Sequence, residues 1–499
     1  MSAIAKLIKG GAWLTLANVV SKLASALVLP ALARLLGPEA LGIYSIIFSL
    51  AQSAQGFCSL GADVAMHRNG AQYQTLGTEA VGRLFGVGLS LICLVSAVTG
   101  LGVWFFRDPL AHYWLGQQNV TPWLGAAALL IVLQPFSNIP LLFLASLQDF
   151  RAYALRSSLE MIFTSAFTAL LAWKFGLVGA VSGLVLAEIV QIPWSYFVAQ
   201  PVLKARGIRL RIDQFWKETQ SILQFGFPYY FGNTLLGSLV GLPLMGLVSQ
   251  YGGLEELGYL RVAQSMATLI GFIPSAIAPA AISYLSASSA DNEQAHQYLK
   301  SVHLRGVWAL LLVPTGAVCL VLPEAISALF GSSYQQAIVL SWLSLWISAL
   351  AGVVSVLVQY LLVAGKTVRV AWASLLGVIS WILAAFVLVP QYRALGFLIA
   401  QTIGQIIGLL FVLRPAIIDF DIKDTFLLLN FLLATFFILI WSFILSILGL
   451  VLPLITSDNS FTYLAMPVIA LISFTWLFVK GLHPAEKTKV KKLLEGVRR

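Results

Sequence analysis

Long apolar runs without charge constrain this chain more than any other feature. Residues 425–455 contain no Asp, Glu, Lys or Arg, and a helix needs only about 20 apolar residues to cross a hydrocarbon core. Over the whole chain 10% of the residues are charged and 59% are hydrophobic, whereas soluble domains carry about 25% charged residues. Soluble enzymes, secreted proteins and nucleic-acid factors need far more polar surface, so these classes are excluded.

Fourteen apolar segments qualify as transmembrane helices. They are residues 11–36, 40–63, 84–106, 121–147, 157–173, 177–200, 219–249, 257–285, 306–323, 336–363, 371–389, 394–413, 425–453 and 461–479. A transmembrane barrel fits badly, because barrel strands alternate apolar and polar residues over about ten positions. Since a helix satisfies its own backbone hydrogen bonds in lipid, the predicted fold class is an all-α polytopic membrane protein.

The basic residues divide unevenly between the two sides of the predicted membrane. If both termini are cytoplasmic, the cytoplasmic segments hold 24 of the 30 Lys and Arg residues and the outer segments hold 4. This imbalance follows the positive-inside rule. We therefore expect cytoplasmic termini, and we attribute most of the net charge of +10 to topology. No sequence motif accompanies this charge that would indicate binding to nucleic acid.

The two halves of the chain share residues at a nearly constant spacing. The pairs are Gly10 and Gly226, Gly37 and Gly253, Glu39 and Glu255, Gly42 and Gly258, Gly116 and Gly331, and Gly179 and Gly396, at offsets between 215 and 217. An even number of helices per repeat keeps both copies in the same orientation. Parallel repeats of this kind are typical of transporters that move two lobes around a central site.

The repeat predicts four parts in the chain. Residues 1–213 form an N-terminal lobe of six helices, and residues 214–424 form a C-terminal lobe of six. Residues 425–480 hold an accessory pair of helices, and residues 481–499 form a basic cytoplasmic tail. The tail is either a solvated anchor or a contact with anionic membrane lipids.

Cations inside predicted spans are candidate substrate-binding residues, because a charge in the membrane is expensive. Lys22 lies near the middle of the first span, where it either lines a wet cavity between the lobes or joins a structural ion pair. Arg261 lies one turn into the eighth span, and Arg34 near the outer end of the first. Both are placed to bind substrate or to extend to the membrane surface. Glu160 follows Arg156 by four residues, which favours a local ion pair.

Acidic residues in the spans are candidates for ion coupling or gating. Glu188 is central in the sixth span, where it either binds H⁺ or Na⁺ or pairs with a cation of its own lobe. Asp63, at the inner end of the second span, either forms an inner gate with Arg68 and Arg83 or caps a solvated helix end. We expect no other cofactor.

Polar and aromatic residues at matching positions of the two halves complete the candidate site. Asn18 precedes Lys22 by one turn, and Asn233 lies in the equivalent region of the seventh span. Their side chains would suit sugar hydroxyl groups. Tyr230 either stacks on a sugar ring or anchors the helix at the membrane interface. The scattered histidines and three cysteines show no metal-ligand spacing, so no metal site is predicted.

Three short motifs carry a family resemblance. They are A-R-L-L-G-P-E-A-L-G-I-Y-S at residues 33–45, L-G-A-D at residues 60–63 and F-G-F-P at residues 225–228. With the architecture, they resemble the bacterial polysaccharide-transport family. Its members are flippases of lipid-linked O-antigen, capsule or exopolysaccharide repeat units, within the multidrug/oligosaccharidyl-lipid/polysaccharide exporter superfamily.

The resemblance implies two six-helix lobes in a V, two further helices and a place in the bacterial inner membrane. It implies that an undecaprenyl-diphosphate-linked glycan moves to the outer leaflet by alternating access, with polysaccharide polymerase machinery as a partner. Lys22 and Arg261 match the first-helix and eighth-helix positions where the related lipid II flippases carry arginines. The second helix has no comparable mid-membrane cation.

Two other functions compete with this reading. A multidrug or toxin extruder of the same superfamily would favour an acidic, apolar cavity for cationic drugs. A membrane polysaccharide polymerase or ligase would need a large outer loop and a catalytic constellation, and neither is visible. The sequence therefore predicts a secondary transporter and not an enzyme.

Overall fold

A computed structural model describes residues 3–63, 65, 66, 73, 77–147, 149–230, 236–291, 293–363 and 366–417. Most of these residues are helical, and no strand is present among them. The predicted thirteenth and fourteenth spans, at 425–453 and 461–479, lie outside the described residues.

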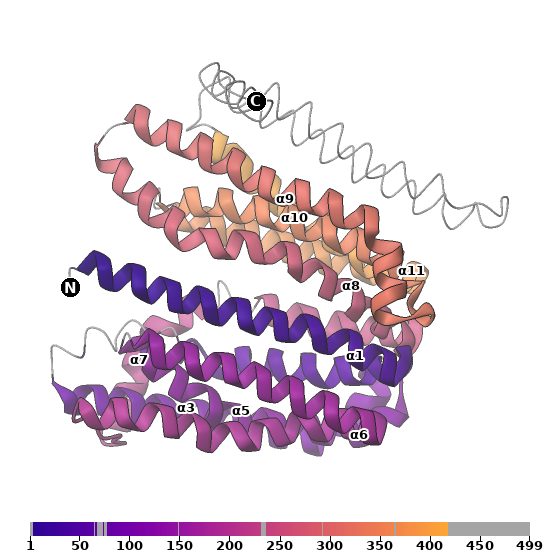
Figure 1. The fold of residues 1–499 in the computed structure, drawn as a ribbon, viewed down its shortest axis with the longest axis horizontal. Coiled ribbons are helices and arrows are strands. Elements are labelled where there is room, and N and C mark those ends of the chain that lie inside the picture. The colour runs from indigo at the N-terminus through magenta and orange to yellow at the C-terminus, as the bar shows by residue number, and fades with distance from the viewer. Residues whose placement is uncertain are drawn as a thin grey trace, which may run out of the picture. The chain divides into compact units, whose positions relative to one another are not determined.

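Ten α-helices and three short helical turns make up this part of the chain (Figure 1). The α-helices are α1 (Ala3–Ser59), α3 (Thr78–Phe105), α4 (Arg107–Pro109), α5 (Thr121–Ser146), α6 (Phe150–Ala205), α7 (Phe215–Tyr230), α8 (Leu236–Asp291), α9 (Glu293–Phe330), α10 (Ala337–Val363) and α11 (Thr367–Ile417). The turns are η1 (Leu110–Trp114), η2 (Gln118–Val120) and η4 (Ser332–Tyr334).

Six described segments are long and apolar enough to cross a membrane. They are Leu27–Ser59, Thr78–Phe105, Gln118–Ser146, Phe150–Ala205, Ala337–Leu361 and Val368–Leu413. Their length and composition, and the predominance of helices among the described residues, confirm the predicted class of polytopic α-helical membrane protein.

Four of the long helices are each two helices joined at a sharp corner. The corners lie at Gly37 in α1, Gly176 in α6, Gly253 in α8 and Arg393 in α11. Each corner falls between two spans that the sequence predicts separately, so α6 and α11 each contain two candidate crossings. A positive φ at the corner turns the chain back on itself, a conformation that glycine adopts most readily.

The corners repeat along the chain at the spacing of the predicted duplication. Gly37 has φ 75° and ψ 174°, and Gly253, 216 residues later, has φ 82° and ψ −179°. Gly176 has φ 57° and ψ −134°, and Arg393, 217 residues later, has φ 52° and ψ −127°. The same backbone conformation at equivalent positions supports an internal repeat.

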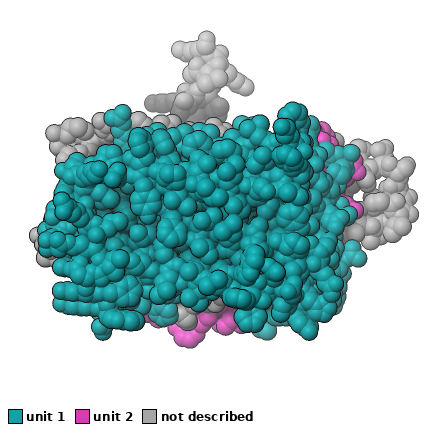
Figure 2. Space-filling model, turned by 90° about the horizontal axis from the view of Figure 1, so that it is seen from below, with its two compact units in different colours: residues 1–261, 329–333, 382–400 teal, residues 262–328, 334–381, 401–499 magenta. Residues whose placement is uncertain are grey.

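The chain divides into two compact units (Figure 2). Unit 1 contains residues 1–261, 329–333 and 382–400, and unit 2 contains residues 262–328, 334–381 and 401–499. Within unit 1, α6 packs against α1 and α5, and α3 packs against α5. The lobe boundary at residues 213 and 214 stays a prediction.

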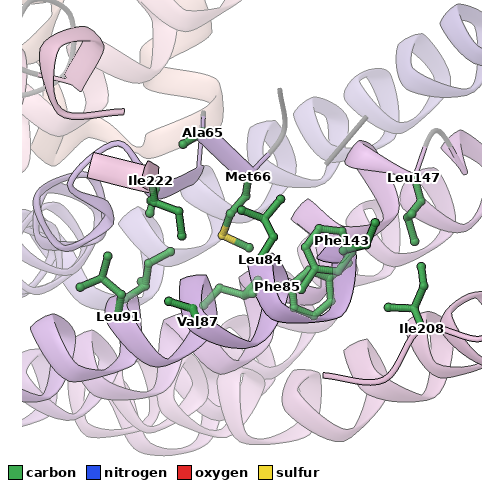
Figure 3. Packing of buried hydrophobic residues seen from close by; sticks show 14 residues of the cluster. Ala65, Met66, Leu84, Phe85, Val87, Leu91, Phe143, Leu147, Ile208 and Ile222 are labelled. Carbon is green, nitrogen blue, oxygen red and sulfur yellow. The ribbon is translucent and has the colours of Figure 1, made fainter. Parts of the chain in front are cut away.

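An apolar cluster joins several helices of unit 1 at the end of the spans that is predicted to be cytoplasmic (Figure 3). The rings of Phe85 from α3 and Phe143 from α5 stack with their centroids 4.4 Å apart. Met66 packs into the same cluster, as do Ile208 of the linker after α6 and Ile222 of α7. The linker is therefore held against the first helices of the chain by buried side chains.

Candidate functional site

A buried arginine organises a polar cluster inside unit 1. Arg156, on the first half of α6, is 0% exposed. Its Nη1 contacts Glu160 one turn later, and its Nε donates to the hydroxyl of Ser195 on the second half of α6. Its Nη2 donates to the backbone carbonyl of Ser137 on α5 at 2.8 Å. One guanidinium thus joins three helical segments in the membrane-spanning region.

Glu188 extends this cluster from the second half of α6. Its side chain is buried at 8% exposure, and the hydroxyl of Ser137 donates to its Oε2 at 2.6 Å. Ser137 therefore contacts Arg156 through its carbonyl and Glu188 through its hydroxyl. Ser137 thus bridges Glu188 and Arg156, and these two side chains form no direct ion pair among the described residues.

A glutamine links the same two halves of α6 further along the cluster. The amide of Gln191 donates to the hydroxyl of Thr164 at 2.9 Å and to the carbonyl of Glu160 at 3.3 Å. The Gln191 side chain, like that of Ser195, is fully buried. Buried polar groups joined in this way fix the relative position of the helices that carry them.

Arg261 occupies a different environment, on α8. Its guanidinium lies over the ring of Phe48 of α1, 4.6 Å from the ring centroid. Tyr44, one turn earlier on α1, stacks beside Phe48, with the ring centroids 6.3 Å apart and the ring planes 17° from parallel. No carboxylate forms an ion pair with Arg261 among the described residues. Its positive charge is thus held by an aromatic face and is not neutralised by an acid there.

Arg34 binds the end of another helix. Its Nε donates to the carbonyl of Leu329 in the last turn of α9, at 2.9 Å. The side chain is exposed at the end of the first span, at the corner before Gly37. A cation at a helix C-terminus interacts favourably with the carbonyls there.

Arg83, a predicted gating residue, faces the linker between α6 and α7. Its Nη1 lies 3.7 Å from Asp213, and its Nε lies 3.8 Å from Glu218. The hydroxyl of Tyr73 donates to the same Glu218 at 3.3 Å. The described acids beside Arg83 are therefore Asp213 of the linker and Glu218 of α7.

The chain crosses itself closely beside Asp63. Gly61, after α1, and Gly226, in α7, approach so closely that a Cβ on either would overlap the backbone of the other. The Oδ1 of Asp63 is buried there and has no hydrogen-bond partner among the described residues. Tyr230, one turn after Gly226, is also buried, at 1% exposure. Two predicted site residues thus lie beside one backbone crossing.

Four predicted site residues fall outside the described side chains. Lys22 and Asn18 lie on α1, but their side chains are not among those described. Arg68 and Asn233 lie outside the described residues altogether. Their proposed roles stay predictions.

The sequence alone indicated neither the contacts of Ser137 and Ser195 nor the burial of Arg156. Four-residue spacing correctly indicated the contact between Arg156 and Glu160. Ser137 and Ser195 gave no comparable signal, because a serine in an apolar span usually bonds its own helix. The flanking Pro135 and Pro140 of α5 are the only local hint, since each removes a backbone donor near Ser137.

No metal site appears in the part of the chain that the structure describes. Clusters of three or more His, Cys, Asp and Glu side chains are absent from it. The three cysteines are free.

Solved structures with the same fold are membrane transporters. A lipid II flippase MurJ in an inward closed conformation aligns with a TM-score of 0.69 and 16% identity, over 93% of this chain and 97% of the other. An inward-facing multidrug resistance MATE family transporter of the MOP superfamily aligns with a TM-score of 0.63 and 16% identity, over 81% and 94%. The Vibrio cholerae MATE transporter VcmN aligns with a TM-score of 0.56 and 15% identity, over 83% and 96%.

These likenesses show that the chain has the fold of these membrane transporters. Residues 7–289, more than half of the chain, match the family described as polysaccharide biosynthesis protein. The chain belongs to this family, as its motifs suggested. No curated protein sequence matches it.

Proposed function

We propose that this protein is a flippase for lipid-linked oligosaccharides of polysaccharide biosynthesis. It moves an undecaprenyl-diphosphate-linked repeat unit from the cytoplasmic to the outer leaflet of the bacterial inner membrane, with both of its termini in the cytoplasm. Membership of the polysaccharide biosynthesis family supports the glycan. The structural likeness to a protein named as a lipid II flippase supports a lipid-linked cargo.

The observation that carries the proposal is the environment of Arg261. This cation lies on a predicted span over Phe48, and no described acid pairs with it. A diphosphate cannot cross about 30 Å of hydrocarbon unaided. A guanidinium without an acidic partner provides charge-assisted hydrogen bonds to phosphate oxygens. Lys22 and Arg34 are further candidates for contacts with the headgroup, and Asn18, Asn233 and Tyr230 for contacts with the sugars.

Transport requires that the protein open to each side of the membrane in turn. Directed movement also requires that the two states bind the cargo with different affinity. We propose alternating access driven by an ion gradient, H⁺ or Na⁺, without other cofactors and without enzymatic chemistry. A polysaccharide polymerase would take the glycan on the outer side. Asp63, Arg68 and Arg83 are the proposed gating residues.

The second candidate is a multidrug extruder, which the likeness to MATE transporters favours. The two functions differ in the charge of the cargo. Arg261 would repel a cationic drug, whereas it would attract a diphosphate. The removal of this charge should therefore affect the two kinds of cargo in opposite directions.

The test is complementation of a deletion strain with variants of the protein. We expect Arg261→Ala to abolish surface glycan, to cause the accumulation of lipid-linked glycan in the inner leaflet and to leave the protein level normal. Arg261→Lys should retain part of the activity. Arg107→Ala is the matched control, because Arg107 lies over the ring of Trp104 at the same distance of 4.6 Å. Glycan export at the wild-type level by Arg261→Ala would contradict the proposal.

A further inference from the structure

The hydroxyl of Ser137 has two acceptors but only one proton. It lies 2.6 Å from Oε2 of Glu188 and 2.9 Å from the carbonyl oxygen of Gln134 on its own helix. A serine hydroxyl donates one hydrogen bond and accepts others. If Glu188 is ionised, Ser137 can serve only one of these two acceptors. If Glu188 carries a proton, it donates to Ser137, and Ser137 donates to Gln134, so both contacts become hydrogen bonds.

The charges of the cluster lead to the same conclusion. Arg156 donates its three described hydrogen bonds to Ser195, to Glu160 and to the carbonyl of Ser137. Glu160 therefore balances Arg156, and an ionised Glu188 would be a buried excess negative charge. An unpaired charge in an apolar interior is strongly unfavourable, and such a group normally neutralises instead. One bound proton makes the whole cluster neutral.

Other ionisable groups near Glu188 do not supply this neutralisation. The charged groups that act on Glu188 are Glu160 and Arg156, from the first half of α6. Helix α5 contains no ionisable side chain between Thr121 and Ser146. The described side chains of α1 that ionise are Arg34, Glu39, Tyr44 and Cys58, and none of them is among the charged groups that act on Glu188.

A proton suits this position better than a metal cation does. A metal ion beside Glu188 would lie close to the guanidinium of Arg156, which contacts the same Ser137, and the two positive charges would repel. It would also need several oxygen ligands at once, whereas a proton needs one carboxylate oxygen and one acceptor. The Ser137 hydroxyl provides that acceptor.

From this geometry we propose that Glu188 is a reversible proton-binding site, with Ser137 as its hydrogen-bond switch and Arg156 and Glu160 as its fixed charged neighbours. The inference rests on the proposed transport function, and it names the coupling ion as H⁺. In the bound state the proton is on a Glu188 oxygen and is donated to Ser137. On release it leaves as H⁺, and the Ser137 hydroxyl turns from Gln134 to the carboxylate.

The switch is placed to act on the packing of the helices. Ser137 belongs to α5 and Glu188 to the second half of α6, so the hydrogen bond between them joins two separate spans. Pro135 and Pro140 of α5 and Pro193 of α6 lie inside these helices. Each proline removes a backbone hydrogen bond and permits a bend. Protonation would thus change a contact between two helices that are able to bend.

The first experiment measures the proton directly, on purified protein in lipid nanodiscs without cargo. Infrared difference spectra are recorded as the pH is varied, and the carbonyl stretch of a protonated carboxylic acid is followed. We expect a band whose intensity changes with pH and which is lost in Glu188→Gln, because glutamine keeps the shape of the side chain but cannot bind the proton. Glu79→Gln, which removes an exposed carboxylate outside the cluster, is the control and should retain the band. Absence of the band in wild type, or its persistence in Glu188→Gln, would overturn the proposal.

A second variant tests the switch itself. Ser137→Ala removes the hydroxyl that stabilises the ionised carboxylate, so the midpoint of the band should rise by about one pH unit. An unchanged midpoint would show that Ser137 has no such role. The measurement needs no glycan, and its outcome is therefore independent of the cargo. If the deletion strain shows no glycan defect but the band behaves as expected, the proposed cargo is wrong and the proton site stands.

Discussion

The backbones of Gly61 and Gly226 cross in direct contact, and neither position has room for a side chain. A Cβ on Gly61 would overlap the carbonyl group of Gly226, and a Cβ on Gly226 would overlap that of Gly61. Both glycines lie at the end of the spans that the basic residues predict to be cytoplasmic. An alternating-access protein must break such a contact when it opens on that side.

Substitution at this crossing should disturb the closed state of the cytoplasmic side. We expect Gly61→Val to separate the two segments and to increase the labelling of a cysteine placed at Tyr230 by a membrane-impermeant thiol reagent in inside-out vesicles. Glycan export should fall, because the closed state is less populated. Gly102→Ala is the control, since a Cβ at Gly102 meets nothing within 4 Å. Equal labelling with and without Gly61→Val would rule out a closing contact here.

The removal of Arg156 should destabilise the protein more than the removal of an exposed ion pair. Arg156→Leu leaves Glu160 without its cation and Ser195 without its donor, and the loss of one partner of a buried pair costs about 3–5 kcal/mol. Arg211 and Glu79, at the surface, lie 3.1 Å apart, and Arg211→Ala should cost at most about 1 kcal/mol. Thermal unfolding in detergent measures both. A similar melting temperature for the two variants would contradict this ranking.

Stability should fall as the pH falls below the ordinary pKa of histidine. Burial lowers the pKa of His303, which is outside the predicted spans, below its ordinary value of 6.5. Its Nδ1 lies 3.0 Å from the hydroxyl of Tyr360. Because the folded protein favours the neutral ring, the unfolded chain takes up a proton first on acidification, and unfolding becomes easier.

The measurement for this prediction is the melting temperature at a series of pH values between 8 and 5. His303→Gln should remove the part of the decrease that begins near pH 6.5. Wild type and variant with parallel curves over this interval would show that His303 does not contribute.

Because φ is positive at the corners, substitutions there should change stability in opposite directions, depending on whether the corner residue is glycine. Gly253 has φ 82°, where a residue with a Cβ is strained, so Gly253→Ala should lower stability by about 1–2 kcal/mol. At the equivalent type of corner in α11, Arg393 already tolerates φ 52°, and Arg393→Gly should relieve strain. Gly241→Ala, in a helix with open space around the Cβ, is the control. Denaturation in detergent with all three variants would test this order.

Much of the architecture was predictable because it is encoded locally. Apolar runs of the length of a membrane determine where helices cross, and the charges of the loops determine the expected orientation. The repeat spacing paired Gly37 with Gly253 and residues 176–180 with residues 393–397, and the structure has matching corners at these places. The spacing of Arg156 and Glu160 likewise predicted a contact within one helix turn.

The partners of the functional side chains were not predictable in this way. The sequence offered Arg83 as one possible partner of Asp63 in an inner gate, and it did not indicate the contacts of Arg83 with Asp213 and Glu218. Nothing in the sequence indicated that Phe48 would support Arg261, or that Ser137 would reach Glu188. Each of these contacts joins residues on different helices.

By itself, then, the sequence determined that this is a helical membrane protein with a duplicated arrangement of spans, because hydropathy and charge act over one turn or one crossing at a time. Only the tertiary structure decided which buried charge is balanced and which is not. That outcome depends on the rotation of each helix about its axis, which places Arg156 against Glu160 and Glu188 against a serine hydroxyl. In an apolar helix many rotations bury similar surface, and only long-range packing selects one of them.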